Sequence, residues 1–145
     1  MTNTHFYEVN LKWDGITRGT LSSPVIPETI EVVTPPEFPN GIKEKWTPEH
    51  LFVAAVNSCL MSTFLLVADN SKFKFISFDC NATGKIEKIN GKFAVTEIVI
   101  KPKLLIAATQ NEAKAKRLLE MSEKACAISN SINTKINLES FITIQ

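Results

Sequence analysis

The stretch that decides the fold is TPEHLFVAAVNSCLMSTFLLVADN, residues 47–70. Thr47 has the side chain of a helix N-cap, Pro48 suits the first helical position, and Glu49 places a negative charge in the first turn. No helix breaker follows before the Asp69-Asn70 pair. The sequence therefore predicts one long helix over this stretch.

Apolar residues occupy almost every side of this helix, so we expect it to be buried on most sides. A membrane span is the competing interpretation, because about twenty apolar residues cross a bilayer. Polar residues at 57–59 and 62–63 and the lack of a flanking basic bias argue against it. We expect no membrane partner.

The region before the helix has the pattern of strands. Residues 6–21 alternate around an Asp14-Gly15 turn signal and predict a β-hairpin. The β-branched stretch 30–34 predicts a third strand. The proline-rich segment 35–41 then predicts an ordered loop, placed to line a pocket just before the helix.

The region after the helix returns to strand periodicity. Residues 76–83 alternate and end at Gly84, and an Asn90-Gly91 hairpin signal separates strands at 85–89 and 93–102. An amphipathic helix at 111–125 and a last strand at 136–144 follow. This order predicts a single α+β domain over residues 1–145, in which antiparallel sheet wraps the apolar helix.

Composition limits the function classes. Sixteen basic against fifteen acidic residues leave a net charge of +1 without a basic block, so no nucleic-acid partner is expected. Met1 to Trp13 has no apolar leader pattern, which predicts a cytoplasmic protein. With His5 and His50 as the only histidines, we expect no metal and no other cofactor.

Three cysteines form an odd, widely spaced set that does not suggest a disulfide framework. Cys59 lies among the only polar residues of the apolar helix, and Cys126 precedes a run of hydroxyl and amide side chains at 129–131. Cys80 alternates onto the apolar face of a strand. Each could be an inert buried thiol, but the pattern favours a functional pair plus one packing residue.

Two segments resemble the OsmC/Ohr family. Residues 47–60 are similar to that family's helix with a Pro-Glu start and a Ser-Cys pair, and residues 123–132, EKACAISNSI, resemble its A-E-K-x-C-P-[VI]-S-N-[AS]-[IL] segment. Ala127 departs from the proline usual in this segment. The order of elements matches the family over nearly the whole chain.

The resemblance implies an OsmC-like fold, an intertwined homodimer with two active sites at the interface, and a thiol peroxidase of the oxidative stress response that acts on organic hydroperoxides. It implies Cys59 as the peroxidatic cysteine, Cys126 as the resolving cysteine, and Glu49 as the family's glutamate. Arg18 fits the arginine of the Ohr branch by its position, although no Ohr-like motif surrounds it. An external dithiol would reduce the resulting disulfide.

Peroxide reduction by a thiol requires residues of the same types. A thiolate attacks a peroxide oxygen, and a nearby cation favours the thiolate. Arg18 is the better candidate of the two arginines, Arg18 and Arg117, although an exposed strand residue is its simpler interpretation. Glu49 lies ten residues before Cys59, about 15 Å along a helix, so only the partner subunit's Glu49 could reach that thiol. Without the family resemblance, Glu49 could simply be a carboxylate favoured by the helix dipole at a helix start.

Two other functions stay open. One is a non-catalytic OsmC-like binding or scaffold protein in which the cysteines do not turn over. The other is a thiol enzyme for acyl transfer or hydrolysis, which is disfavoured because His50 lies nine residues before Cys59, near 180° around the helix. Apolar lining from the helix and residues 35–38 favours a bulky organic hydroperoxide over hydrogen peroxide alone.

Overall fold

The computed structural model describes residues 3–145, so Met1 and Thr2, the start of the segment expected to lack a leader, lie outside the described residues. The chain divides into two compact units, Met1–Leu51 and Phe52–Gln145. Helix α1, Pro48–Asn70, contributes its first residues to one unit and the rest to the other. The single-domain organisation stays a prediction.

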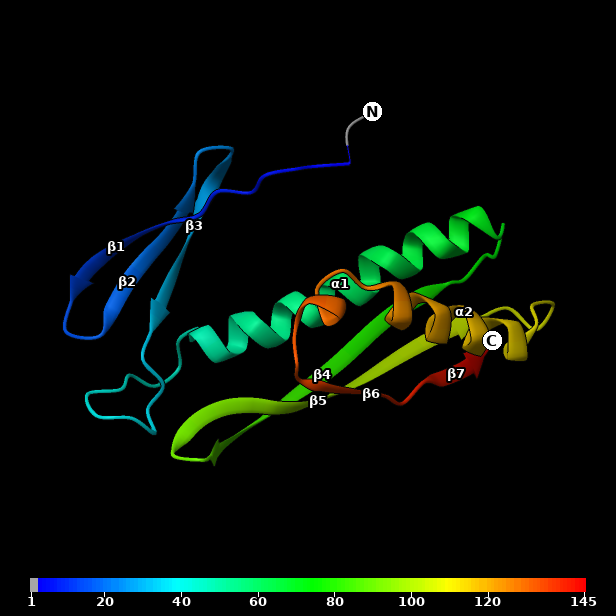
Figure 1. The fold of residues 1–145 in the computed structure, drawn as a ribbon. Coiled ribbons are helices and arrows are strands. Elements are labelled where there is room, and N and C mark those ends of the chain that lie inside the picture. The colour runs from blue at the N-terminus through cyan, green and yellow to red at the C-terminus, as the bar shows by residue number, and fades with distance from the viewer. Residues whose placement is uncertain (1–2) are drawn as a thin grey trace. The chain divides into compact units, whose positions relative to one another are not determined.

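The first unit contains a three-stranded antiparallel sheet in the order β1-β2-β3 (Figure 1). Its strands are β1, Asn10–Gly15, β2, Arg18–Ser23, and β3, Ile26–Val33. The turn between β1 and β2 places Gly15 at φ +104°, a conformation that glycine adopts without strain. The predicted hairpin and third strand are confirmed, with a third strand longer than expected at its start.

Large apolar side chains of this unit remain exposed. Tyr7 and Val25 are almost fully accessible, and Trp13 and Leu11 keep most of their surface in solvent. Apolar surface on this scale on an isolated chain is typical of a face that another protein or another copy covers. The sheet is therefore poorly covered within one chain.

The proline-rich loop after β3 is ordered by backbone contacts. The amide of Val33 donates to Trp46 O at 2.9 Å. The amide of Ile42 donates to Thr34 O at 3.0 Å. A Cβ at Gly41 would lie 1.9 Å from the carbonyl oxygen of Pro35, so only glycine fits there. The loop thus leads directly to the start of α1.

The start of α1 is capped as predicted. The buried Thr47 accepts a hydrogen bond at its hydroxyl from the backbone amide of His50, 3.1 Å away. Its carbonyl accepts from the amide of Leu51 at 3.0 Å, which begins the helical ladder. Thr47 therefore satisfies a donor that would otherwise have no partner at the helix start.

The second unit is built on β4, Ser77–Ile89, and β5, Lys92–Ile106, which form a long antiparallel pair. The Asn90-Gly91 turn joins them with both residues at positive φ, so this predicted hairpin is confirmed. Strands β6, Lys135–Leu138, and β7, Phe141–Ile144, both pair with β5 in parallel. The expected single last strand is therefore two strands.

The expected break at Gly84 is wrong, because β4 runs through this residue without interruption. A Cβ at Gly84 would lie 2.6 Å from Cγ2 of Val53 on α1. Glycine is present because the helix approaches the strand backbone closely, and not because the strand ends there. The local irregularity falls instead between Lys85 and Ile86.

Helix α1 and helix α2, Glu112–Ala125, cover the same face of this sheet (Figure 1). Two clusters form the core: Phe64, Ala68, Phe73, Leu104, Ile106, Ala115, Leu118 and Leu119 in one, and Val56, Leu60, Ile98, Ile100 and Cys126 in the other. Helix α2 buries one face, as its predicted amphipathic pattern requires, with Ala115, Leu118, Leu119 and Ser122 buried. The α+β class is confirmed.

Helix α1 buries only one face within the chain. Its buried residues recur every fourth position at Val56, Leu60, Phe64 and Ala68, whereas Leu66 is 60% exposed. The expected burial on most sides is therefore wrong for one chain, because a single sheet contacts a helix along one stripe. By length and composition alone, α1 could also cross a membrane, but this buried stripe already accounts for part of its apolar character.

Candidate functional site

The structure brings the two predicted redox cysteines together in the second unit. Cys126 follows α2 as its C-cap residue and is 1% exposed, packed with Val56 and Leu60 of α1. Cys59 is half-buried and packs against the same cluster. Cys59 is close enough to Cys126 to be among the groups that raise the pKa of the Cys126 thiol. The pair therefore lies where the C-terminal end of α2 meets the middle of α1.

The surroundings of Cys126 keep its thiol protonated. Burial, the neighbouring Cys59 and the Glu123 carboxylate raise the pKa of Cys126 to about 11, opposed by a hydrogen bond from Thr63. Its Sγ donates to the carbonyl oxygen of Ser122 at 3.1 Å. The reduced Cys126 is therefore a neutral, weakly reactive thiol at neutral pH.

Cys80 lies on β4 and packs against the same apolar cluster as Cys59 and Cys126. The Asn57 side chain donates to Cys80 O at 3.1 Å, and Cys59 follows two residues later, about 200° around the helix axis. Burial raises the pKa of Cys80 to about 11. Cys80 is half-buried among apolar neighbours, which is consistent with its predicted packing role.

Hydrogen bonds hold the turn after Cys126, even though Ala127 replaces the expected proline. The amide of Asn130 donates to Cys126 O at 3.0 Å, and its side-chain amide donates to Lys124 O at 3.2 Å. Ser131 Oγ donates to Ala127 O at 2.6 Å. The hydroxyl and amide side chains at 129–131 thus fix the chain direction beside Cys126.

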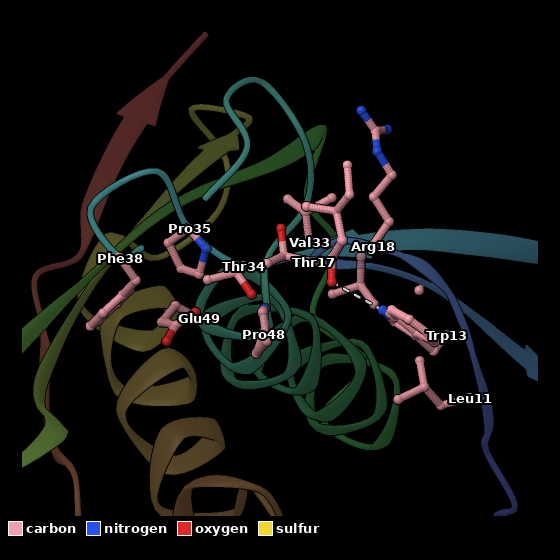
Figure 2. Close-up of a pocket in the computed structure, with 13 residues that line it drawn as sticks. Leu11, Trp13, Thr17, Arg18, Val33, Thr34, Pro35, Phe38, Pro48 and Glu49 are labelled. Atoms are coloured by element: carbon pink, nitrogen blue, oxygen red, sulfur yellow. Dashed lines mark hydrogen bonds between the residues drawn. The ribbon is translucent and has the colours of Figure 1, made fainter. Parts of the chain in front are cut away.

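Arg18 and Glu49 both line one pocket of the first unit, with a volume of about 510 Å³ (Figure 2). The pocket is mostly apolar, with lining from Leu11, Trp13, Val33, Pro35, Phe38 and Pro48 among others. Trp13 Nε1 donates to Ile16 O at 3.0 Å, which holds the indole in place. The structure confirms that residues from 35–38 line a pocket, as the sequence predicted.

The two charged residues of this pocket do not pair with each other. Arg18 Nη1 lies 3.5 Å from Glu31 Oε2, and Figure 2 shows its guanidinium pointing away from Glu49. A hydrogen bond and the charge of Lys45, with a smaller effect of Arg18, lower the pKa of Glu31. Among residues 3–145, no hydrogen-bond partner reaches the buried Oε1 of Glu49. The Arg18–Glu31 pair is exposed and contributes little stability.

The four predicted site residues thus fall in two groups, Arg18 and Glu49 in the first unit and Cys59 and Cys126 in the second. Sequence analysis missed Thr63, whose hydroxyl lowers the pKa of Cys126. Its position one turn after Cys59 was the signal that could have found it, because residues four apart share a helix face.

No metal or histidine chemistry is evident in the part of the chain that the structure describes. It contains no group of three or more His, Cys, Asp or Glu residues that could hold a metal ion. The His50 ring is engaged at the start of α1, with Nδ1 2.8 Å from the hydroxyl of Thr47 and an edge contact to Trp46.

Solved structures share this fold. An OsmC-like protein of unknown function from Vibrio cholerae has a TM-score of 0.85 at 23% identity, covering 94% of this chain and 99% of that one. An organic hydroperoxide resistance protein OsmC from Legionella pneumophila has a TM-score of 0.75 at 18% identity, covering 97% and 99%. The organic hydroperoxide resistance protein OhrB of Bacillus subtilis has a TM-score of 0.69 at 16% identity, covering 95% and 98%. The OsmC-like fold is confirmed.

The sequence itself matches the model of the OsmC-like protein family over residues 41–140. An uncharacterized protein of Methanocaldococcus jannaschii is 30% identical over 96 residues, which cover 66% of this chain. The chain spans about half the length of that relative, 49%. Because the family match includes α1, both core clusters, Cys59 and Cys126, the chain belongs to the family of OsmC-like proteins.

Proposed function

We propose that this protein is a thiol-dependent peroxidase that reduces organic hydroperoxides through Cys59 and Cys126. The observation that carries the proposal is the placement of both thiols in one apolar cluster. A half-exposed thiol can meet a peroxide, and a buried thiol beside it can close a disulfide without a large movement. Cys80 also packs against this cluster, but Asn57, which donates to its carbonyl oxygen, lies about 200° around α1 from Cys59.

The proposed reaction has three balanced steps. The Cys59 thiolate attacks one peroxide oxygen, the O–O bond breaks, and the organic group leaves as an alkoxide that takes up a proton to become an alcohol. Cys126 then attacks the sulfur of the Cys59 sulfenic acid, the S–S bond forms and water leaves. An external dithiol finally reduces this disulfide by exchange and is itself oxidised.

The remaining roles are also proposals. The apolar pocket of the first unit, with Trp13 and Phe38 in its lining, supports an organic rather than an inorganic peroxide. Arg18 would supply the activating cation and Glu49 would orient it. The exposed apolar surfaces of α1 and of the first unit support a homodimer that covers them. A cytoplasmic location would supply the reducing dithiol.

A peroxidase assay tests this function. Cumene hydroperoxide and a dithiol are supplied in excess, and peroxide loss is followed for wild type, Cys59→Ser, and Cys80→Ser as the matched control. We expect steady turnover by wild type and Cys80→Ser and none by Cys59→Ser. Equal turnover by Cys59→Ser and wild type would contradict the proposal.

Mass mapping identifies the disulfide. One equivalent of hydroperoxide should link Cys59 to Cys126 and leave Cys80 reduced, because Cys59 and the Cys80 backbone lie on opposite sides of α1. Recovery of Cys80 in the bridge would overturn the assignment of the resolving cysteine.

A non-catalytic binding protein is the second candidate. The observation that favours it is the engagement of Arg18 with Glu31, which leaves the buried Glu49 oxygen without a hydrogen-bond partner among residues 3–145. Under this alternative, wild type consumes no peroxide in the same assay even with the dithiol present.

A further inference from the structure

The side chain of Asn57 joins the middle of α1 to strand β4. Its Nδ2 donates to the carbonyl oxygen of Cys80 at 3.1 Å. One turn earlier on the same face of the helix, Cγ2 of Val53 lies 2.6 Å from the place where a Cβ at Gly84 would stand. The helix therefore meets the strand at two positions one turn apart. Only the contact of Asn57 is directional, because a hydrogen bond weakens when its angle changes.

The carbonyl of Cys80 is open to this donor because the neighbouring strand cannot supply one. Cys80 is paired with Pro102 of β5. Proline has no backbone N–H, so this pair residue cannot donate to the carbonyl. Strand β4 also lies at the end of its sheet, so among residues 3–145 no strand on its other side provides a donor. The Asn57 amide therefore bonds to a carbonyl that the sheet leaves unpaired.

The other end of the Asn57 amide is not compensated. Its Oδ1 is buried, and among residues 3–145 no hydrogen-bond donor reaches it. A buried acceptor without a partner costs stability, whereas leucine has nearly the same size and carries no such acceptor. Asparagine at this position is therefore poorly explained by stability alone, and its directional bond to the strand indicates a role in holding the helix in place.

The orientation of α1 determines where the Cys59 side chain points. Cys59 follows Asn57 by two residues, about 200° around the helix axis. Val56 and Leu60, on the intervening part of the helix, pack with Cys126 at the end of α2. Because α1 is one continuous helix, a rotation that moves Asn57 along the strand also moves the Cys59 sulfur relative to Cys126.

We infer that Asn57 is a positioning residue for the proposed disulfide, whose hydrogen bond to the Cys80 carbonyl holds α1 in the rotation that brings Cys59 to Cys126. The inference rests on the proposed function, because only the pairing of these two cysteines gives the rotation a chemical consequence. Asn57 acts through the helix, so the attack of Cys59 on the peroxide does not depend on it.

Asn57→Leu tests the inference, because leucine keeps the size of the side chain and removes the amide. Ser58→Ala is the matched control, since the Ser58 hydroxyl donates to a carbonyl of its own helix. Both changes are made in a Cys80→Ser parent, which keeps the backbone carbonyl at that position. The equilibrium constant for the Cys59–Cys126 disulfide is measured in glutathione buffers of known ratio, by acid quenching and mass spectrometry.

We expect this constant to fall about fivefold in Asn57→Leu, since one hydrogen bond typically contributes about that factor to an equilibrium. Ser58→Ala should stay within about twofold of the parent. The urea midpoint of reduced Asn57→Leu should stay close to the parent's, because the change removes one unpartnered acceptor, Oδ1, and creates another, the Cys80 carbonyl. Asn57→Ala also lacks the amide and should show the same fall in the constant, which keeps the test decisive if the leucine variant does not fold. An unchanged constant in the Asn57 variants would overturn the inference, as would an equal fall in Ser58→Ala.

A single-turnover experiment separates the two chemical steps. After one equivalent of cumene hydroperoxide, dimedone traps the Cys59 sulfenic acid and mass spectrometry follows the disulfide. Asn57→Leu should close the disulfide about fivefold more slowly, with peroxide loss within about twofold of the parent. Slowing of both steps by the same factor would overturn the positioning role. Absence of peroxide loss in wild type would instead overturn the proposed function, with the glutathione equilibrium still deciding the role of Asn57.

Discussion

Burial of the Cys126 thiol should make the protein less stable in alkali. Burial and its neighbours raise the pKa of Cys126 from 9.0 to about 11. A raised folded-state pKa gives stability that is fully present below the unfolded value, and this stability is lost as the pH rises through the folded value. Above pH 9 the unfolded chain releases the proton more readily than the folded chain, so the loss runs from about pH 9 to pH 11.

The size of this effect follows from the two pKa values. At pH 10.5 the unfolded thiol is almost fully ionised while the folded thiol is mostly protonated, which corresponds to about 2 kcal/mol of lost stability. At pH 8 both forms are largely protonated and the loss is close to zero.

Urea unfolding at pH 8 and pH 10.5, with a non-thiol reductant present, measures this loss. The experiment uses a Cys80→Ala background, because burial also raises the pKa of Cys80 to about 11. Cys126→Ala in the same background is the control, since all other titrating groups are shared. We expect the free energy of unfolding of the Cys126-containing protein to fall by about 2 kcal/mol more than that of the control. Equal falls in the two proteins would refute the assigned burial and hydrogen bonding of Cys126.

Three further outcomes are expected. Gly84→Ala should lower the free energy of unfolding by about 1 to 3 kcal/mol, because its Cβ would lie 2.6 Å from Val53 Cγ2, and Val53→Ala should recover part of that loss in the double variant. Strict additivity in urea unfolding would show that the two residues are not in contact. Wild type should sediment as a homodimer. Leu66→Glu should weaken the dimer, because it places a charge on the exposed apolar face of α1. A wild-type monomer at micromolar concentration would exclude the dimer. Arg18→Ala should slow first-turnover oxidation of Cys59 about tenfold or more, with partial recovery in Arg18→Lys, and an unchanged rate would leave Arg18 as a strand residue paired with Glu31.

Local patterns in the sequence were sufficient for most of the elements. The cap at Thr47, the Asn90-Gly91 turn and the inward face of α2 each depend on residues close together in the chain, and each is confirmed. The predicted strand end at Gly84 was wrong, because a glycine at a strand end and a glycine beneath a helix cannot be distinguished in the sequence. Only the packing of Val53 on the strand backbone distinguishes them.

Within the candidate site, local sequence information was sufficient to select two cysteines but not to place Arg18. Polar neighbours and the family resemblance singled out Cys59 and Cys126, and the structure places both, together with Cys80, in or against one cluster. The same information could not place Arg18, whose observed partner is Glu31 on the neighbouring strand β3. An ion pair between strands depends on register, and register comes from pairing over the whole sheet.

By itself, the sequence determined the α+β class and the long apolar helix, because these follow from periodicity and capping residues near one another in the chain. The choice of Cys59 and Cys126 over Cys80 also came from local motif residues and stays a prediction. The tertiary structure decided which face of α1 is buried, the parallel pairing of β6 and β7 with β5, and the packing of Cys126 against Val56 and Leu60 of α1. Contacts of this second kind join elements far apart in sequence, and their free energy depends on burial and distance that no local pattern records.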